Sequence, residues 1–142
     1  EIHPDIQTGY AKIYLEKDME LNLLFDMRVR FLRANRNVSF NTGKTAVKRG
    51  PVVYCFEEAD NGKNLSSIYL FTDYTVQEHY ADKLGGIVEL EIPGKKMKNH
   101  TEHLYEEYTP DFEDIVCKAV PYAYWNNRGI GEMAVWMHTV MF

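Results

Sequence analysis

Two histidines, His100 and His103, stand three residues apart, which is the spacing in this chain closest to that of a metal site. A zinc site needs three or four ligands in a defined geometry, and the neighbouring Asn99 is a poor zinc ligand. The segment from Asp60 to Asn64 is similar to a calcium loop but lacks the bidentate glutamate that completes one. We therefore predict no metal site, and we interpret residues 60–64 as a turn.

Paired carboxylates are the groups that glycosidases use, and Glu57 and Glu58 are adjacent at the end of an apolar run. A glycosidase pair stands about 5–10 Å apart across a cleft, whereas neighbouring residues of a strand point to opposite faces. We therefore do not expect these two glutamates to act together, and Glu57 is better suited to pairing with a strand arginine. The sequence predicts no catalytic residue in this chain.

The two cysteines, Cys55 and Cys117, lie in separate apolar stretches. Burial in an apolar strand raises the pKa of a thiol and lowers its reactivity, so neither residue is a candidate nucleophile. Two buried free thiols are favoured over a disulfide, although pairing and the redox compartment both stay open. The chain has no Cys-x-x-Cys and no G-x-S-x-G motif, and no helix pattern follows the G-x-G of residues 129–131.

Aromatic residues are numerous, with 10 Tyr, 7 Phe and 2 Trp among 142 residues. Tyr122, Tyr124, Trp125 and Trp136 could form a platform on which a sugar stacks, as in a carbohydrate-binding module. Aromatic side chains more often fill the core of an all-β domain, so burial is the favoured interpretation. Exposed coplanar rings would favour sugar binding, and buried rings would favour a structural role.

The net charge is −5, from 16 basic and 21 acidic residues, which argues against nucleic acid as a partner. No apolar run approaches the length of about 18 residues that crosses a membrane, so we expect no membrane partner. The charges are segregated: residues 28–49 contain seven basic residues and no acid, and residues 102–114 contain six acids and no Lys or Arg. We interpret both segments as solvated strand faces and loops rather than as a surface for an anionic partner.

The dominant sequence period is two, which is typical of half-buried strands. Apolar and polar residues alternate over 19–27, 27–31 and 88–92, and residues 133–137 form a short apolar run. With short connections between segments, this pattern predicts an all-β fold, an antiparallel β-sandwich or jelly roll of about nine strands.

Turn residues separate these segments, among them Pro93-Gly94. Gly50-Pro51 interrupts an otherwise continuous strand, and because proline cannot donate to a ladder we expect a bulge, a sheet edge or a crossing between two sheets there. Single helical turns are expected around residues 76–84 and 102–108.

Two segments carry a more specific signal, Gly43 to Glu57 and Val120 to Trp136. Their distinctive residues are Arg49, Gly50, Pro51 and Tyr54 in the first, and Pro121, Trp125, Asn127, Arg128, Gly129 and Trp136 in the second. Both segments resemble the C-terminal β-sandwich region of the bacterial β-L-arabinofuranosidase-like proteins of glycoside hydrolase family 127, formerly a domain of unknown function. Residues 9–27 look like the strand pair that precedes this region. The chain departs from the family at Ala123, where a second tyrosine is usual, and at Lys48.

The resemblance implies that catalysis belongs to an upstream helical barrel, which carries a zinc-bound cysteine nucleophile and a glutamate acid/base. No part of this chain matches that barrel, so the resemblance implies no zinc or other cofactor here. It also implies a boundary, with residues 1–32 as the terminal strands of a preceding β-sandwich and residues 33–142 as the C-terminal β-sandwich domain. Residues 1–32 are expected to pack onto that domain or to pair with another copy through an exposed strand edge.

Together these observations predict a non-catalytic C-terminal module of a bacterial glycoside hydrolase, which supports the catalytic barrel and can form a homodimer. A carbohydrate-binding module that uses Tyr122, Tyr124 and Trp125 is the alternative. The motif residues are expected to be structural, with Arg128 either paired with Glu132 or facing the barrel. The sequence begins at Glu1 without a signal-peptide pattern, so we expect an excised part whose compartment, whether periplasmic, extracellular or cytoplasmic, the sequence does not define.

Overall fold

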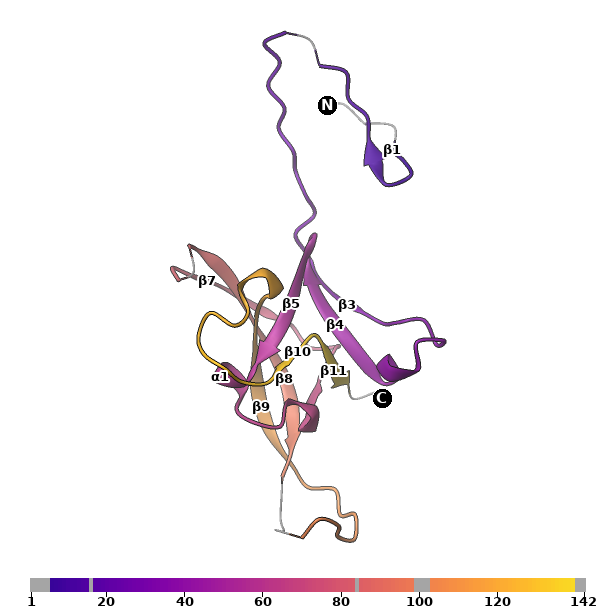
Figure 1. Ribbon diagram of the computed structural model, residues 1–142, viewed down its shortest axis with the longest axis vertical. Helices are drawn as coiled ribbons and strands as arrows, with labels where there is room; N and C mark the ends of the chain where they lie inside the picture. The colour runs from indigo at the N-terminus through magenta and orange to yellow at the C-terminus, as the bar shows by residue number, and fades with distance from the viewer. Residues whose placement is uncertain (1–5, 16, 84, 99–102, 140–142) are drawn as a thin grey trace.

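The computed structural model describes residues 6–15, 17–83, 85–98 and 103–139, and it consists mainly of β-strands (Figure 1). The strands are β1 (Ile6–Gln7), β2 (Tyr10–Ala11), β3 (Val29–Leu32), β4 (Lys44–Arg49), β5 (Val52–Glu57), β6 (Ile68–Leu70), β7 (Gln77–Ala81), β8 (Ile87–Met97), β9 (Phe112–Pro121), β10 (Met133–Ala134) and β11 (Trp136–Thr139). The helical segments are α1 (Glu58–Asn61) and the 3-10 turns η1 (Ser39–Asn41), η2 (Leu65–Ser67) and η3 (Tyr122–Tyr124).

The main sheet closes on itself into a six-stranded barrel, in the order β5-β9-β8-β6-β11-β4 and back to β5. The β11–β6 pair is parallel, and the other neighbours in this ring are antiparallel. The all-β class is confirmed, but the predicted antiparallel sandwich or jelly roll is wrong. Alternation shows only that one face of a strand is buried, which is equally true of a sandwich and a barrel, whereas closure depends on which strands pair.

Gly50 and Pro51 form the turn between β4 and β5, so the segment predicted as one interrupted strand is two strands of a hairpin. Arg49 pairs with Val52 at its base. Gly50 has φ +55°, and a Cβ atom at this position would lie 2.5 Å from the sulfur of Met27. Both the backbone conformation and the close neighbour favour glycine at this corner.

Strand β8 continues through Pro93-Gly94, where a turn was predicted. β7 pairs with residues 87–91 of β8, and β6 pairs with residues 94–96 along the same edge. Pro93 lies between these two partners, which agrees with its lack of a backbone donor. The helical turn predicted around residues 76–84 is also wrong, because β7 occupies residues 77–81. Residues 103–108 contain no helix, and residues 99–102 lie outside the described part of the chain.

The barrel interior is filled by one hydrophobic cluster, and a smaller cluster lies on the other face of β5 and β9. Tyr54 and Phe56 belong to the interior cluster, while Cys55 between them belongs to the smaller one. Cys117 points into the interior, so the two thiols lie in different clusters, and both are buried and free. Burial raises the pKa of each thiol to about 12, which confirms the expectation of inert buried cysteines.

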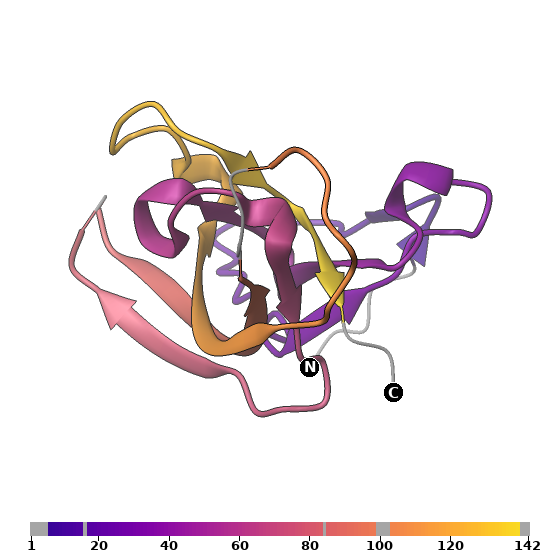
Figure 2. The same cartoon turned by 90° about the horizontal axis from the view of Figure 1, so that it is seen from below.

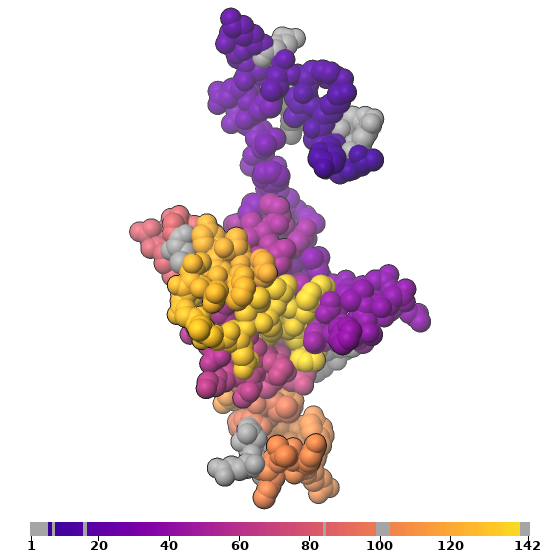
Figure 3. Space-filling view, in the orientation of Figure 1, coloured from indigo at the N-terminus to yellow at the C-terminus, as the bar shows by residue number. Residues whose placement is uncertain are grey.

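Residues 6–15 and 17–27 lie outside the barrel and project from one end of it (Figures 1 and 3). β1 and β2 pair only with each other, and the strands predicted from the alternation over residues 19–27 are not formed. Most of the large apolar side chains of this segment are exposed, including Leu23, Leu24 and Phe25, whereas Ile13 and Met27 are partly buried. β3, by contrast, joins the main sheet by pairing with β4. The division of the chain at residues 32 and 33 stays a prediction.

In the view along the long axis, β7 lies on the outside of the barrel, where it pairs with the barrel strand β8 (Figure 2). Opposite charges meet across several strands of the surface, as in the ion pairs of Arg49 with Glu78 and of Lys95 with Asp114. Asp26 forms ion pairs with both Arg28 and Arg30, and the Arg28 guanidinium keeps the pKa of this carboxyl well below its usual range. Among the helices of the described residues, none has the length and apolar character needed to cross a membrane.

Candidate functional site

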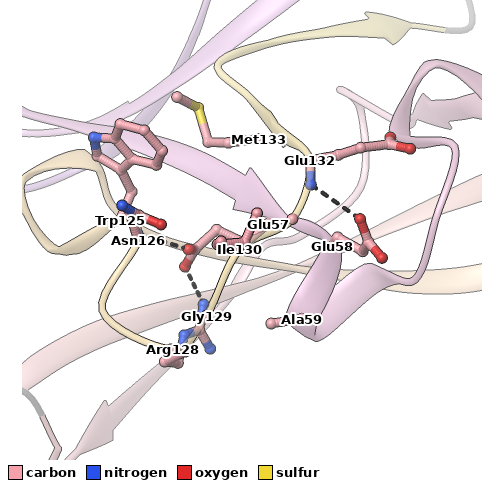
Figure 4. Close-up of a pocket in the computed structure, with 11 residues that line it drawn as sticks. Glu57, Glu58, Ala59, Trp125, Asn126, Arg128, Gly129, Ile130, Glu132 and Met133 are labelled. Carbon is pink, nitrogen blue, oxygen red and sulfur yellow. Dashed lines mark hydrogen bonds and ion pairs between the residues drawn. The ribbon is translucent and has the colours of Figure 1, made fainter.

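The second sequence motif forms a loop, residues 125–132, that folds over the end of β5 and over α1 (Figure 4). We call it the Arg128 loop. It begins after η3, which follows β9 directly, and it ends where β10 pairs with the last two residues of β5. The loop is therefore held at both ends by the barrel, and a shallow recess lies between it and α1.

Arg128 is the centre of this loop. Its Nη1 donates to Oδ1 of Asp60 at 2.7 Å, and its Nη2 lies 2.6 Å from Oδ2 of Asp60 and also binds Glu57. The side chains of Glu57 and Asp60 are only 7% and 12% exposed, so these carboxylates depend on the guanidinium for compensation. The two carboxylates, Asp60 first, raise the pKa of Arg128 above its ordinary value.

The three glutamates of the site bind different parts of it. Glu57 accepts a hydrogen bond from the backbone N–H of Asn126 at 3.0 Å, and Glu58 accepts one from the N–H of Glu132 at 3.0 Å. The Glu132 carboxylate accepts from the N–H groups of Leu65 and Asn64, which lower its pKa. Arg128 therefore pairs with Glu57 and Asp60 and not with Glu132, which was one of its two expected positions, while the other, facing the barrel of the parent enzyme, stays a prediction. The arginine that binds Glu57 comes from a loop rather than a strand.

The aromatic residues of the motif separate into two groups. Tyr122 and Trp125 are 43% and 39% exposed, and their rings stack with centroids 6.3 Å apart and planes inclined by 24°. Tyr124 instead packs against the smaller hydrophobic cluster, with Cys55 and Val120. Trp136 lies in β11 opposite Ala46 and is half-buried. The structure thus leaves one aromatic pair, Tyr122 and Trp125, available at the edge of the recess.

The remaining motif residues hold strands and turns together. The Tyr54 hydroxyl donates to the carbonyl of Val88 at 2.9 Å, and burial raises its pKa. Pro121 is buried opposite Tyr54. The Asn127 amide donates to the Tyr124 carbonyl at 2.9 Å, and Gly129 has φ +126°, a conformation that favours glycine.

The described residues contain no group of three or more His, Cys, Asp or Glu side chains that could hold a metal ion. His103 lies in this part of the chain, whereas Asn99 and His100 lie outside it. The carboxylates of Glu57 and Asp60 are both engaged by Arg128, so they form an ion cluster and not an acid/base pair across a cleft.

Sequence reasoning singled out Arg128 and Glu57 but did not find that they meet, and it missed Asp60 as the second carboxylate. Glu57 ends β5 and Asp60 lies in α1, which follows β5 directly, whereas Arg128 lies 68 residues beyond Asp60 in the loop. Only the pairing of β10 with β5 brings the loop over α1, and no local pattern encodes that pairing.

Residues 29–138 match the glycoside hydrolase family 127 C-terminal domain. The chain belongs to this family. It is 36% identical over 139 residues to the non-reducing end β-L-arabinofuranosidase of Bifidobacterium longum subsp. longum, a match that covers 89% of this chain and 20% of that protein.

Two solved structures of the family resemble this fold. A family 127 β-L-arabinofuranosidase from Geobacillus stearothermophilus T6 has a TM-score of 0.76 and 37% identity, covering 80% of this chain and 18% of that one. A second family 127 β-arabinofuranosidase has a TM-score of 0.72 and 31% identity, covering 82% and 18%. The chain therefore spans about a fifth of the length of the family 127 enzymes that it matches.

Proposed function

We propose that this chain acts as a non-catalytic C-terminal module of a family 127 glycoside hydrolase and supports an upstream catalytic barrel. The observation that carries the proposal is the state of the reactive groups. The carboxylates of Glu57 and Asp60 are both ion-paired with Arg128, and the thiols of Cys55 and Cys117 are buried with a pKa of about 12. Each group serves packing or ion pairing, as a support module requires.

A panel of aryl glycosides, with aryl β-L-arabinofuranosides included, tests this proposal on the isolated chain. We expect no turnover above the uncatalysed rate at any pH between 4 and 9. Turnover that is lost on replacing Glu57 or Glu58 with glutamine would contradict the non-catalytic role.

The zinc of the family belongs, in this proposal, to the barrel and not to this chain. The described residues offer no cluster of ligands that fits a zinc ion, since the two cysteines lie in different hydrophobic clusters. Metal analysis of the purified chain should therefore find zinc well below one equivalent.

Homodimerisation through exposed strand edges is a second part of the proposal. Within the described part of the chain, β3, β7 and β10 each pair with a barrel strand on one side only, which leaves backbone donors and acceptors on the other. Light scattering coupled to size exclusion should give the mass of a dimer, which falls to that of a monomer when Phe31 of β3 is replaced by proline.

Sugar binding is the second candidate function, and the stacked and half-exposed pair of Tyr122 and Trp125 favours it. Titration calorimetry with L-arabinose and arabino-oligosaccharides tests this function directly. Binding that is lost in Trp125→Ala but kept in Tyr105→Ala, an exposed aromatic of another loop, would support it over the scaffold role.

A further inference from the structure

Ile130 is the most exposed large apolar side chain of the described residues, at 104% of its reference area. It lies at the tip of the Arg128 loop, between Gly129 and Gly131. Single exposed apolar residues are common on protein surfaces, so exposure alone does not mark a contact site. Ile130 differs from the other exposed apolar residues in that hydrogen bonds and ion pairs hold its loop in place.

The Arg128 loop is braced at several points along its length. Glu57 binds the N–H of Asn126, Glu58 binds the N–H of Glu132, and Arg128 is held from below by two nearly buried carboxylates. Removing these charges from water costs free energy, and fixing the side chains in one arrangement costs conformational entropy as well. A loop that only connected η3 to β10 through solvent would not need this cluster.

The two glycines of the tip complete the arrangement. Gly129 has φ +126°, a conformation that favours glycine, and a Cβ atom on Gly131 would lie 3.1 Å from the Cβ of Glu58. The tip therefore sits tightly on α1, while Ile130 between the two glycines is fully exposed at the mouth of the recess that it lines. Trp125 and Ile130 line the same recess (Figure 4), and the Trp125 ring stacks on that of Tyr122.

A rigid apolar tip beside half-exposed aromatic rings has the composition of a binding hot spot. In each matched enzyme, 80% or more of the chain lies outside the part that corresponds to this chain. That remainder can supply the surface onto which the loop docks. A partner within the same polypeptide is present at a fixed position, so a preorganised loop gives up little entropy on docking.

We propose that residues 125–132 are the surface by which this module docks onto the remainder of a family 127 enzyme, with Ile130 inserted into an apolar pocket of that remainder. Tyr122 and Trp125 cover the rim of the contact. The ion cluster of Arg128, Glu57 and Asp60, which we call the Arg128 cluster, fixes the position and orientation of the tip. This inference rests on the proposed function, and it identifies the contact through which the module would support the rest of the enzyme.

Hydrogen exchange tests the proposal in a full-length chimera, in which this chain replaces the matching segment of the Geobacillus stearothermophilus enzyme. Amides of residues 125–132 should exchange about 10-fold or more slowly in the chimera than in the isolated 142-residue chain, because burying an isoleucine contributes a free energy of this order. Ile130→Asp should return the exchange to the rate of the isolated chain. Phe40→Asp, which alters a side chain 89% exposed on the η1 connection, is the matched control and should change nothing.

Equal exchange of residues 125–132 in the folded chimera and in the isolated chain would overturn the docking surface. Failure of the chimera with the unaltered chain to fold would also overturn it. The same holds if the isolated chain forms a dimer that Ile130→Asp dissociates, because the partner of Ile130 would then be a second copy of this chain. The proposed function fails on a different result, namely turnover of aryl glycosides by the isolated chain.

Discussion

At the scale of single residues, the ion pairs of Arg128 are expected to contribute more to stability than those of an exposed surface arginine. Its guanidinium is 21% exposed and serves two carboxylates that are less exposed than itself. Asp26 with Arg28 and Arg30 makes a similar triad of charges, but all three side chains are at least 44% exposed. Exposed ion pairs contribute little to stability, whereas removing one partner of a buried pair leaves a charge without compensation.

Arg128→Met should therefore lower the free energy of unfolding by about 3 kcal/mol, because Glu57 and Asp60 stay behind as uncompensated carboxylates. Urea unfolding followed by tryptophan fluorescence measures the loss. Arg30→Met is the control and should cost under about 1 kcal/mol. Similar losses in the two variants would show that the Arg128 cluster is no better paired than the surface.

The carboxyl group of Glu132 makes the stability of the protein depend on pH. The N–H groups of Leu65 and Asn64 lower the pKa of its carboxyl below the usual 4.5. A carboxyl with a lowered folded-state pKa stabilises the protein above its unfolded-state pKa, and this contribution is lost as the pH falls through the folded-state pKa.

Glu132→Gln should accordingly reduce the urea midpoint at pH 7 and have a progressively smaller effect as the pH falls below 4.5. Urea midpoints measured between pH 3 and pH 7 check the trend. The exposed Glu107→Gln serves as the control, with no such trend expected. A Glu132→Gln effect that is equal at pH 3 and pH 7 would contradict the role of the ionised carboxylate.

At the scale of elements, β8 is central to the architecture because three other strands pair with it. β9 pairs along one edge, and β6 and β7 share the other. Gly94 is the position at which β6 approaches, since a Cβ atom there would lie 2.6 Å from the backbone oxygen of Tyr69. Backbone cannot move aside as a flexible side chain can, so β6 and β8 would have to separate.

Gly94→Ala should destabilise the barrel by about 2 kcal/mol, the usual cost of forcing extra volume into a packed site. Lys95→Ala, one residue further along the same strand, is the control, because its ion pair with Asp114 is exposed. Thermal unfolding by circular dichroism distinguishes the two. A Gly94→Ala variant as stable as Lys95→Ala would mean that β6 does not lie as close to β8 as described.

At the scale of the whole molecule, ring closure makes the core continuous. The interior cluster draws on β4, β5, β6, β8, β9 and β11, which are the six strands of the barrel. Cys117 is inside this cluster and Cys55 is in the smaller cluster on the other face of β5. Access to Cys117 therefore requires barrel strands to separate, and access to Cys55 requires the side chains that cover the smaller cluster to move away, so both thiols react only when their part of the structure opens.

An aromatic disulfide reagent at pH 8 should react with neither cysteine of the native chain within minutes and with both in concentrated urea. The pKa of about 12 for each thiol adds to the protection that burial gives. Absorbance of the released thiolate counts the reacted groups. Rapid reaction of one thiol in the native chain would show that its cluster opens locally.

The sequence by itself determined the all-β class, the burial of both cysteines, and the family, because these depend on local alternation and on two contiguous motifs. Only the tertiary structure decided that the sheet closes into a barrel, that Gly50-Pro51 is a hairpin turn, and that Arg128 meets Glu57 and Asp60. Each of these depends on which strands become neighbours. The period of two is the same whether a strand pairs with β4 or β9, so a long-range choice of partner leaves no mark on the local pattern.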